Sequence, residues 1–175
     1  MSYESTTSLK ELAERILAAN TIVCTSHEKP DGDAVGSVLG LVRALSETKD
    51  MHAWLLGSVP PAMEAMTGDT TWTHIGNAKK IPDLEPDLVI VLDTGAWSQL
   101  EILEEWLRAR ADRVIGLDHH ASGDDVAPQR VVDASAAACT MLVLQLIDCL
   151  RIELDMPVAE SLFGGLATDT GWFRQ

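Results

Sequence analysis

The chain has 175 residues, with a formal net charge of −14 at pH 7 and 46% hydrophobic residues. These values fit a single globular domain with a sizeable core, and they exclude a long disordered or low-complexity chain. They also disfavour a nucleic-acid-binding module held by Lys and Arg alone. A phosphate-bearing ligand would need another source of positive charge, and bound divalent metal is the usual one.

The cysteines and the N-terminal sequence predict a cytoplasmic protein. Cys24, Cys139 and Cys149 show neither CxxC spacing nor a disulfide framework, which is typical of free thiols in a reducing compartment. The first residues lack the basic start and the apolar core of a signal peptide. The longest apolar run, 136–147, is shorter than the roughly 18 residues that a membrane span needs. We therefore expect a soluble protein without a membrane partner.

The first part of the chain predicts a helix, a strand and a second helix. Ser8 and Glu11 form a potential capping box, and the apolar spacing that follows predicts an amphipathic helix over 8–20. The run at 21–26 is rich in β-branched residues, which favours a buried strand. After the loop HEKPDGD, helical spacing predicts a helix over 34–47.

The same alternation continues to the end of the chain. The remaining predicted elements are a strand over 52–56, a loop over 57–61, a strand over 88–92, a helix over 100–110, a strand over 114–117 and a helix over 136–150. Asp155, with Pro157 in the first turn, is predicted to begin a last helix. Alternating helices and strands with fully apolar strand interiors predict an α/β fold, a mostly parallel sheet with helices on both faces.

Acidic and imidazole side chains follow the clearest predicted strands. They are His27, Asp31 and Asp33 after the first strand, Asp93 after 88–92, Asp118, His119 and His120 after 114–117, and Asp169 in the last helix. Because ligands bind beyond the carboxyl ends of parallel strands, we expect these side chains to share one cleft. So many carboxylates cannot all stay ionised at short range without cations.

Such a cluster suggests metal-assisted attack on a phosphate ester. Mixed His and Asp ligation suits Mn²⁺, Zn²⁺ or Fe²⁺. Two such ions roughly 3.5–4 Å apart can generate a hydroxide nucleophile and neutralise developing charge. The helix that begins near Ala34 points its positive end at the same cleft, which adds a site for phosphate.

Other polar and aromatic residues have structural interpretations. His52 and His74 are interpreted as surface or core histidines, and Glu101, Glu104 and Glu105 as the solvated face of a helix. The five Trp residues are not interleaved with basic residues, so we expect them to be packing residues.

The polar strand ends fall in four motifs that resemble those of the DHH phosphoesterase superfamily. The motifs are HEKPDGDAVGS at 27–37, VLDTG at 91–95, GLDHH at 116–120 and ATDTGWF at 167–173. The forms PDGDAxGS and TDTGxF resemble the oligoribonuclease (nanoRNase)/pAp-phosphatase branch. The resemblance implies a Rossmann-like DHH catalytic domain over residues 1–175. The C-terminal substrate-binding lobe that usually completes this branch is expected to be absent or truncated.

The resemblance implies that metal ligands come from all four motifs. One ion would be held by His27, Asp31 and Asp93. A second would be held by Asp33, Asp93, His119 and Asp169, so that Asp93 bridges the two. Members of the superfamily often carry an acidic residue in the helix after the third motif, whereas residues 136–141 of this chain have none.

The resemblance also implies a catalytic set and a substrate-binding set. Asp93 would hold the nucleophile, and Asp118 would orient an imidazole from behind. His120 would contact the substrate phosphate as a hydrogen-bond donor or general acid. Ser37, with the amides around it, would bind the phosphate at the helix start.

These implications lead to a specific functional hypothesis. We expect an enzyme with two Mn²⁺ per chain that hydrolyses short oligoribonucleotides to 5′-mononucleotides, with pAp as a second substrate. Mg²⁺, Co²⁺ or another divalent ion is the alternative metal. The alternative substrates are cyclic dinucleotides, pyrophosphate and polyphosphate, and the alternative of another class is a non-catalytic metal- or partner-binding lobe. The sequence leaves open whether the chain forms a homodimer.

Overall fold

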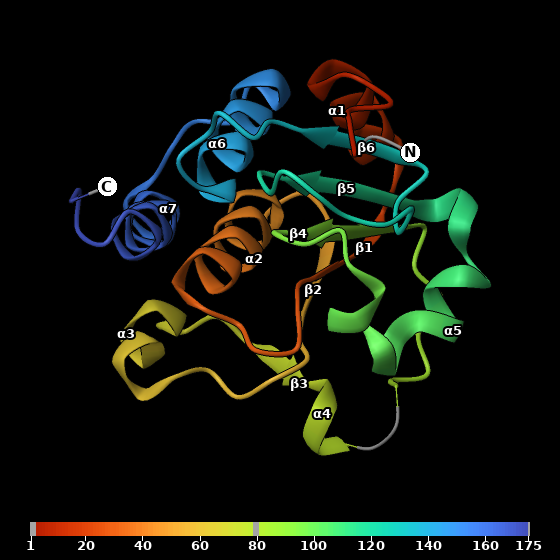
Figure 1. Cartoon of the computed structure of the whole chain (residues 1–175), viewed down its shortest axis with the longest axis horizontal. Coiled ribbons are helices and arrows are strands. Elements are labelled where there is room, and N and C mark those ends of the chain that lie inside the picture. The colour runs from red at the N-terminus through yellow and green to blue at the C-terminus, as the bar shows by residue number, and fades with distance from the viewer. Residues whose placement is uncertain (1–2, 79–80, 175) are drawn as a thin grey trace.

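Six parallel strands form the centre of the molecule in the computed structural model, which describes residues 3–78 and 81–174 (Figure 1). The strands are β1 (Thr21–Thr25), β2 (Asp50–Leu55), β3 (Trp72–His74), β4 (Leu88–Leu92), β5 (Val114–Asp118) and β6 (Gln129–Val132). Their order in the sheet is β3-β2-β1-β4-β5-β6, and every neighbouring pair is parallel. The chain therefore builds the sheet outward from β1 to β3 and then returns to add β4 to β6 on the other side.

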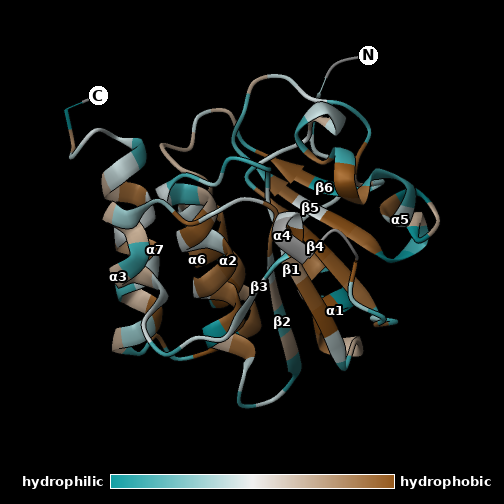
Figure 2. Cartoon of the chain, turned by 90° about the horizontal axis from the view of Figure 1, so that it is seen from below, coloured by the Kyte–Doolittle hydropathy of each residue, from teal (hydrophilic) through white to brown (hydrophobic). Residues whose placement is uncertain are grey.

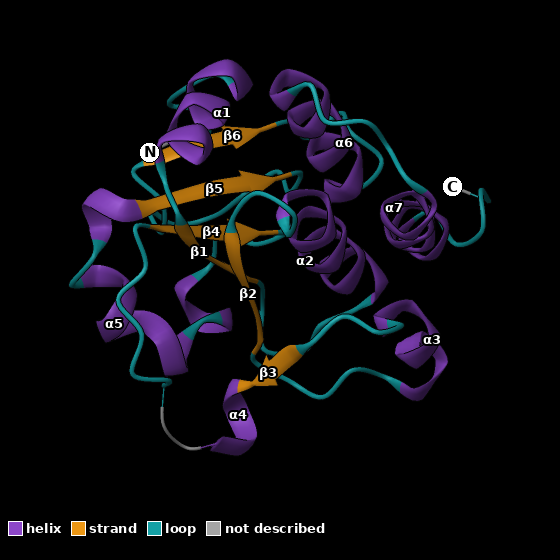
Figure 3. Ribbon diagram, turned by 180° about the vertical axis from the view of Figure 1, so that it is seen from behind, coloured by secondary structure: helices purple, strands orange, loops and turns teal. Residues whose placement is uncertain are grey.

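Helices cover both faces of this sheet, which confirms the predicted α/β fold. One face carries α1 (Leu9–Ala18), α2 (Gly32–Leu45) and α6 (Cys139–Leu150), and α7 (Met156–Asp169) packs on α2 and α6 from outside (Figure 3). The other face carries α5 (Glu104–Arg108), preceded by two short 3₁₀ turns over 97–99 and 101–103. Two short helices, α3 (Glu64–Thr67) and α4 (Ile75–Ala78), flank β3.

The core consists of two apolar layers, one on each face of the sheet. Successive residues of β1 alternate between them, since Ile22 and Cys24 belong to the layer under α2 and α6, and Val23 to the layer under α5. Hydrophobic residues run through β1, β4 and β5 and along α2 and α6 (Figure 2). Within the described part of the chain, no helix is long and apolar enough to cross a membrane.

Several predicted boundaries shift, and two strands are additional to the prediction. The capping box at Ser8 and Glu11 is present, with Glu11 accepting from the Ser8 amide at 2.9 Å. The predicted helix over 100–110 is broken into a 3₁₀ turn and α5, and the helix predicted from 136 begins at Cys139. The edge strands β3 and β6 lack the continuous apolar run of a central strand, because they are less covered.

The contact between α2 and α7 depends on a glycine stripe. Gly32, Gly36 and Gly40 lie four residues apart on one face of α2, and an added Cβ at each would meet α7. At Gly36, that Cβ would lie 2.5 Å from the Ser161 carbonyl oxygen and 3.1 Å from the Gly165 backbone. The two helices therefore approach closely, and this approach brings the end of α7 to the edge of the sheet.

One arginine of α2 links this helix to α3 and α7 through hydrogen bonds. The Arg43 guanidinium donates to the carbonyl oxygens of Met66, Thr67 and Pro157 and to the hydroxyls of Thr70 and Ser161. Its five N–H donors are thereby used, so Arg43 acts as a structural link between α2, α3 and α7.

Candidate metal centre

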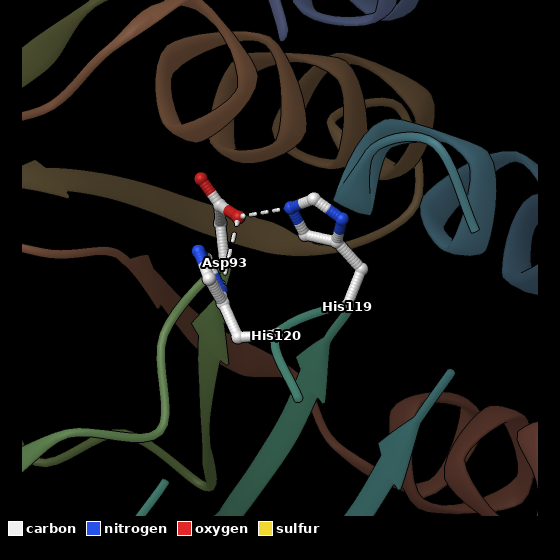
Figure 4. Close-up of side chains that lie close together, drawn as sticks. All are labelled: Asp93, His119 and His120. Atoms are coloured by element: carbon white, nitrogen blue, oxygen red, sulfur yellow. Dashed lines mark ion pairs between the residues drawn. The ribbon is translucent and has the colours of Figure 1, made fainter. Parts of the chain in front are cut away.

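The candidate site lies where the strand order reverses. β1 and β4 are neighbours in the sheet although β2 and β3 separate them along the chain. His27 comes two residues after β1, and Asp93 directly follows β4. His119 and His120 directly follow β5 (Figure 4). Ligands of parallel α/β folds bind at this kind of reversal, outside the carboxyl ends of the strands.

Asp93 stands at the centre of the site. Its carboxylate is buried, with 2% exposure, and its backbone adopts a left-handed conformation with φ of 60°. Oδ1 lies 3.5 Å from Nε2 of His119, and Oδ2 lies 3.5 Å from Nε2 of His27. Oδ1 is buried without a hydrogen-bond partner among the described residues. The two oxygens of Asp93 therefore face two different groups of side chains.

The first group consists of His27, Asp31 and Asp93. Nε2 of His27 lies 3.9 Å from Oδ1 of Asp31. The same oxygen of Asp31 accepts from the Ala34 amide at 3.0 Å and so caps α2. Asp31 is thus a helix cap that also faces the imidazole, and α2 begins at Gly32, earlier than the sequence pattern indicates.

The second group consists of Asp33, His119 and Asp169. Nε2 of His119 lies 3.6 Å from Oδ2 of Asp33 and 3.8 Å from Oδ2 of Asp169, the last residue of α7. Nδ1 of His119 lies 3.3 Å from the Ala136 carbonyl oxygen. A hydrogen bond donated there leaves Nε2 as the lone-pair nitrogen that faces the carboxylates.

Asp33 is held from behind by the N-terminus of α6. Its carboxylate oxygens accept from the amides of Cys139 and Thr140, at 2.5 and 2.9 Å. The segment 136–141, which has no acidic side chain, therefore contributes backbone groups to the site instead. These amides orient the Asp33 carboxylate toward His119.

The arrangement fits divalent cations. Two ligands that each lie about 2.1 Å from one ion are about 3.0–3.5 Å apart. The nitrogen–oxygen separations within the two groups are 3.5–3.9 Å, close to this spacing and too long for good hydrogen bonds. The unpartnered Oδ1 of Asp93 supplies a free ligand atom between them. Mixed imidazole and carboxylate donors suit Mn²⁺, Zn²⁺ and Fe²⁺.

The electrostatics show an excess of carboxylates. Burial, together with the charge of Asp93, raises the pKa of Asp33 to about 7. Interaction with the Asp93 carboxylate raises the pKa of His119 to about 9. Burial by itself would raise the pKa of Asp93, but the imidazoles of His119 and His27 lower it below its ordinary value. The imidazoles thus balance part of a negative charge that a bound cation would balance fully.

Asp118 lies behind His120, whose Nδ1 is 3.9 Å from Oδ1 of Asp93 in a third group with Asp93 and His119. Oδ1 of Asp118 lies 2.7 Å from Nδ1 of His120, and Asp118 is almost fully buried. The imidazole that Asp118 orients is therefore that of His120, whose side chain remains 53% exposed. Figure 4 shows both His119 and His120 facing Asp93. Interaction with Asp118 raises the pKa of His120 above its ordinary value.

Ser37, expected to bind phosphate, lies inside the protein next to the site, and its role stays a prediction. This residue lies in the second turn of α2 and is fully buried. Its hydroxyl has no hydrogen-bond partner among the described residues. The N-terminus of α2 lies at the site, through Asp31 and Asp33, so its backbone amides are placed where a phosphate was expected to bind.

One tryptophan departs from the structural interpretations given to the other residues. His52 is a partly exposed histidine of β2 whose Nε2 lies 3.2 Å from Oδ1 of Asp50. Trp172 is 66% exposed and is not a packing residue, whereas Trp54 is buried at 1% exposure. The exposure of a tryptophan depends on which surfaces the tertiary structure covers, and the sequence pattern does not report this.

The comparisons with known proteins agree with this geometry. The model of the DHH family, N-terminal domain, matches residues 21–167. The chain belongs to the DHH family. This family match confirms the resemblance seen in the four motifs, which all fall within or directly beside the matched residues.

Three relatives illustrate the match. A bifunctional oligoribonuclease and PAP phosphatase NrnA from Thermus thermophilus is 31% identical over 154 residues, which are 87% of this chain and 44% of that protein. A cyclic-di-AMP phosphodiesterase GdpP from Geobacillus thermodenitrificans is 27% identical, over 93% of this chain and 26% of its own length. The crystal structure of an exopolyphosphatase-related protein from Bacteroides fragilis superposes with a TM-score of 0.85 at 27% identity, over 95% of this chain and 51% of that one.

The chain spans about half or less of the length of these relatives. What their names say about activity therefore describes the longer proteins. For this chain, the match shows the family and the fold, and the geometry shows which DHH-motif side chains come together.

Proposed function

We propose that this chain carries the catalytic centre of a phosphoesterase that hydrolyses short oligoribonucleotides to 5′-mononucleotides, with pAp as a second substrate. The observation that carries the proposal is the convergence of His and Asp side chains from four separate motifs around Asp93. The similarity to the Thermus thermophilus oligoribonuclease and PAP phosphatase supports the substrate class. We propose that residues 1–175 form one DHH catalytic domain. That the chain forms a homodimer stays a prediction.

Six residues would hold the metal. They are His27, Asp31 and Asp93 for one ion, and Asp33, Asp93, His119 and Asp169 for the other. Bound Mn²⁺, with Mg²⁺ or Co²⁺ as alternatives, would neutralise phosphate charge and lower the pKa of a water molecule. The chain itself positions the ligands, through the Asp31 cap, the α6 amides behind Asp33 and the Ala136 carbonyl behind His119.

His120 is proposed as the proton donor to the substrate. Its Nδ1 is held by Asp118, which directs the remaining nitrogen, Nε2, away from that carboxylate. An exposed Nε2–H can donate to a phosphoryl or leaving oxygen, and the Asp118 carboxylate raises the pKa of the imidazole and so favours its protonated form. The amides at the start of α2 would add a positive dipole for the substrate phosphate.

Product analysis with the full chain tests this function. We expect pApA incubated with the Mn²⁺-loaded protein to yield AMP, and pAp to yield AMP and inorganic phosphate, both resolved by anion-exchange chromatography. Hydrolysis of cyclic di-AMP, which the similarity to the GdpP protein favours as the second candidate, would yield pApA first. Bound metal with no turnover of any of these substrates would instead support a non-catalytic lobe.

The three unpaired cysteines favour a cytoplasmic location for this activity.

Replacing His120 by Ala is expected to lower kcat by roughly 10²-fold while two Mn²⁺ ions still bind. The proposed ligands do not include this imidazole, so its loss removes the proton donor and leaves the metal groups intact. Steady-state kinetics and calorimetric titration with Mn²⁺ measure the two effects. His52→Ala is the matched control, because His52 also pairs with an aspartate but lies in β2, away from the site. An unchanged kcat in His120→Ala would show that His120 is a structural residue and not the proton donor.

A further inference from the structure

The segment before α1 lies along the open edge of the sheet. Ser5 Oγ donates to the Val132 carbonyl at 3.0 Å and accepts from the Val132 amide at 2.8 Å. Thr6 Oγ1 accepts from the Arg130 amide at 2.9 Å and donates to the Pro128 carbonyl at 2.8 Å. These hydroxyls satisfy backbone groups of the edge strand β6 and fix the path of residues 3–7.

This path places the Tyr3 ring in a slot behind the candidate site. Two glycines line the slot: a Cβ at Gly95 would overlap Tyr3 Oη, and a Cβ at Gly123 would lie 2.6 Å from Tyr3 Cζ. Gly95 follows Asp93 by two residues, and Gly123 follows His120 by three. The guanidinium of Arg130, a residue of β6, lies over the Tyr3 ring at 5.2 Å from the ring centre.

The Tyr3 hydroxyl completes a chain of hydrogen bonds that ends at His120. Tyr3 Oη donates to Oδ2 of Asp118 at 2.8 Å, and Oδ1 of Asp118 lies 2.7 Å from Nδ1 of His120. Burial and the charge of Asp118 raise the pKa of Tyr3, so the phenol stays protonated and acts as the donor. Asp118 is almost fully buried, so Tyr3 supplies a partner that water would otherwise have to supply.

We propose that Tyr3 is a positioning residue for His120. Its hydrogen bond fixes the rotation of the Asp118 carboxylate, which in turn holds the Nδ1–H of the His120 imidazole, so that Nε2 is the nitrogen that gains and loses the proton used in the proposed function. Tyr3 lies outside residues 21–167, so this support comes from a part of the chain that the family model does not match. The consequence for turnover rests on the proposed function, whereas the consequence for the imidazole does not.

The tautomer of His120 tests the proposal without reference to activity. In ¹⁵N-histidine-labelled, metal-free full chain, at a pH where His120 is neutral, we expect its signals to show the Nδ1–H form alone. Tyr3→Phe keeps the ring in its slot and removes only the hydroxyl, and it is expected to give a mixture of tautomers. The missing signals of His120→Ala assign the resonance. Thr6→Val is the matched control, because it weakens the same segment without touching Asp118, and it should leave the tautomer unchanged.

Kinetics supply the second readout. Tyr3→Phe is expected to lower kcat by about three- to tenfold, the value of one hydrogen bond, with KM within about twofold of the wild type. In the His120→Ala background, the same change should have no effect, because the two residues act as one unit. Unchanged His120 signals in Tyr3→Phe, or an equal loss of kcat in both backgrounds, would overturn the proposal. A chain without any hydrolase activity would refute the proposed function. The tautomer measurement would then decide by itself whether Tyr3 positions His120.

Discussion

Asp93→Ala is expected to remove both metal ions and to lower kcat/KM by roughly 10³-fold or more. The two oxygens of Asp93 face two separate groups, with His27 on one side and His119 on the other, each at 3.5 Å. Deleting the carboxylate therefore takes a ligand from both groups at once. It also takes away the carboxylate that lies between the two imidazoles, whereas Asp31, Asp33 and Asp169 remain beside them.

Calorimetric titration of metal-free protein with Mn²⁺ measures this loss, with about two ions per chain expected for the wild type. Asp148→Ala is the matched control, since Asp148 is an exposed aspartate on α6 with no part in the site. It should bind metal as the wild type does. Retention of either ion by Asp93→Ala would contradict the bridging position proposed for this residue.

A second substitution separates metal loss from misfolding. Asp93 has a φ of 60°, a conformation that costs Ala of order 1 kcal/mol but that Asn adopts readily. Asp93→Asn should therefore fold with wild-type stability, as judged by urea denaturation, and still bind metal much more weakly. If Asp93→Asn kept two tightly bound ions, the negative charge of Asp93 would not be what holds them.

Gly36→Ala is expected to destabilise the protein by about 2–3 kcal/mol, although Ala has the higher helix propensity by about 1 kcal/mol. The added Cβ would lie 2.5 Å from the Ser161 carbonyl oxygen, a backbone atom of α7 that cannot move aside alone. The helix as a whole would have to shift. Because α7 ends at Asp169, the shift should also weaken binding of the metal ion that Asp33, His119 and Asp169 would hold.

Gly40→Ala provides the matched control for this effect. Its Cβ would meet Cδ2 of Leu162 at 2.7 Å, the far end of a flexible side chain that can rotate away. We expect Gly40→Ala to stay within about 1 kcal/mol of the wild type, in urea denaturation followed by tryptophan fluorescence. Equal stabilities of the two variants would show that α2 and α7 do not pack as closely as described.

The sequence was sufficient to predict the α/β class and the DHH family. The apolar strand interiors and the helical spacings report how each segment is buried, and burial is a local property that recurs with period 2 or 3.6. The same alternation places polar residues at strand ends. His27, Asp93 and His119 could therefore be expected to meet at one edge before their distances were known, and the four motifs supplied the family.

The spacing of the glycine stripe is visible in the sequence, but its packing partner is not. Gly32, Gly36 and Gly40 recur every four residues, the first two within the first motif and the third just after it. That spacing places them on one face of a helix, but it does not say that α7 covers this face. Ser37 shows the same limit, because membership of a motif does not tell whether a hydroxyl points to the cleft or into the core.

The tertiary structure alone decided three matters: that the strand order reverses between β1 and β4, that Asp118 holds His120, and that Tyr3 holds Asp118. Tyr3 and Asp118 are 115 residues apart, and no local pattern relates them. Such contacts depend on how complete layers pack on one another, which the period of a single segment does not encode. The sequence by itself determined the ligand types and the strands that carry them, whereas packing determined their partners and orientation.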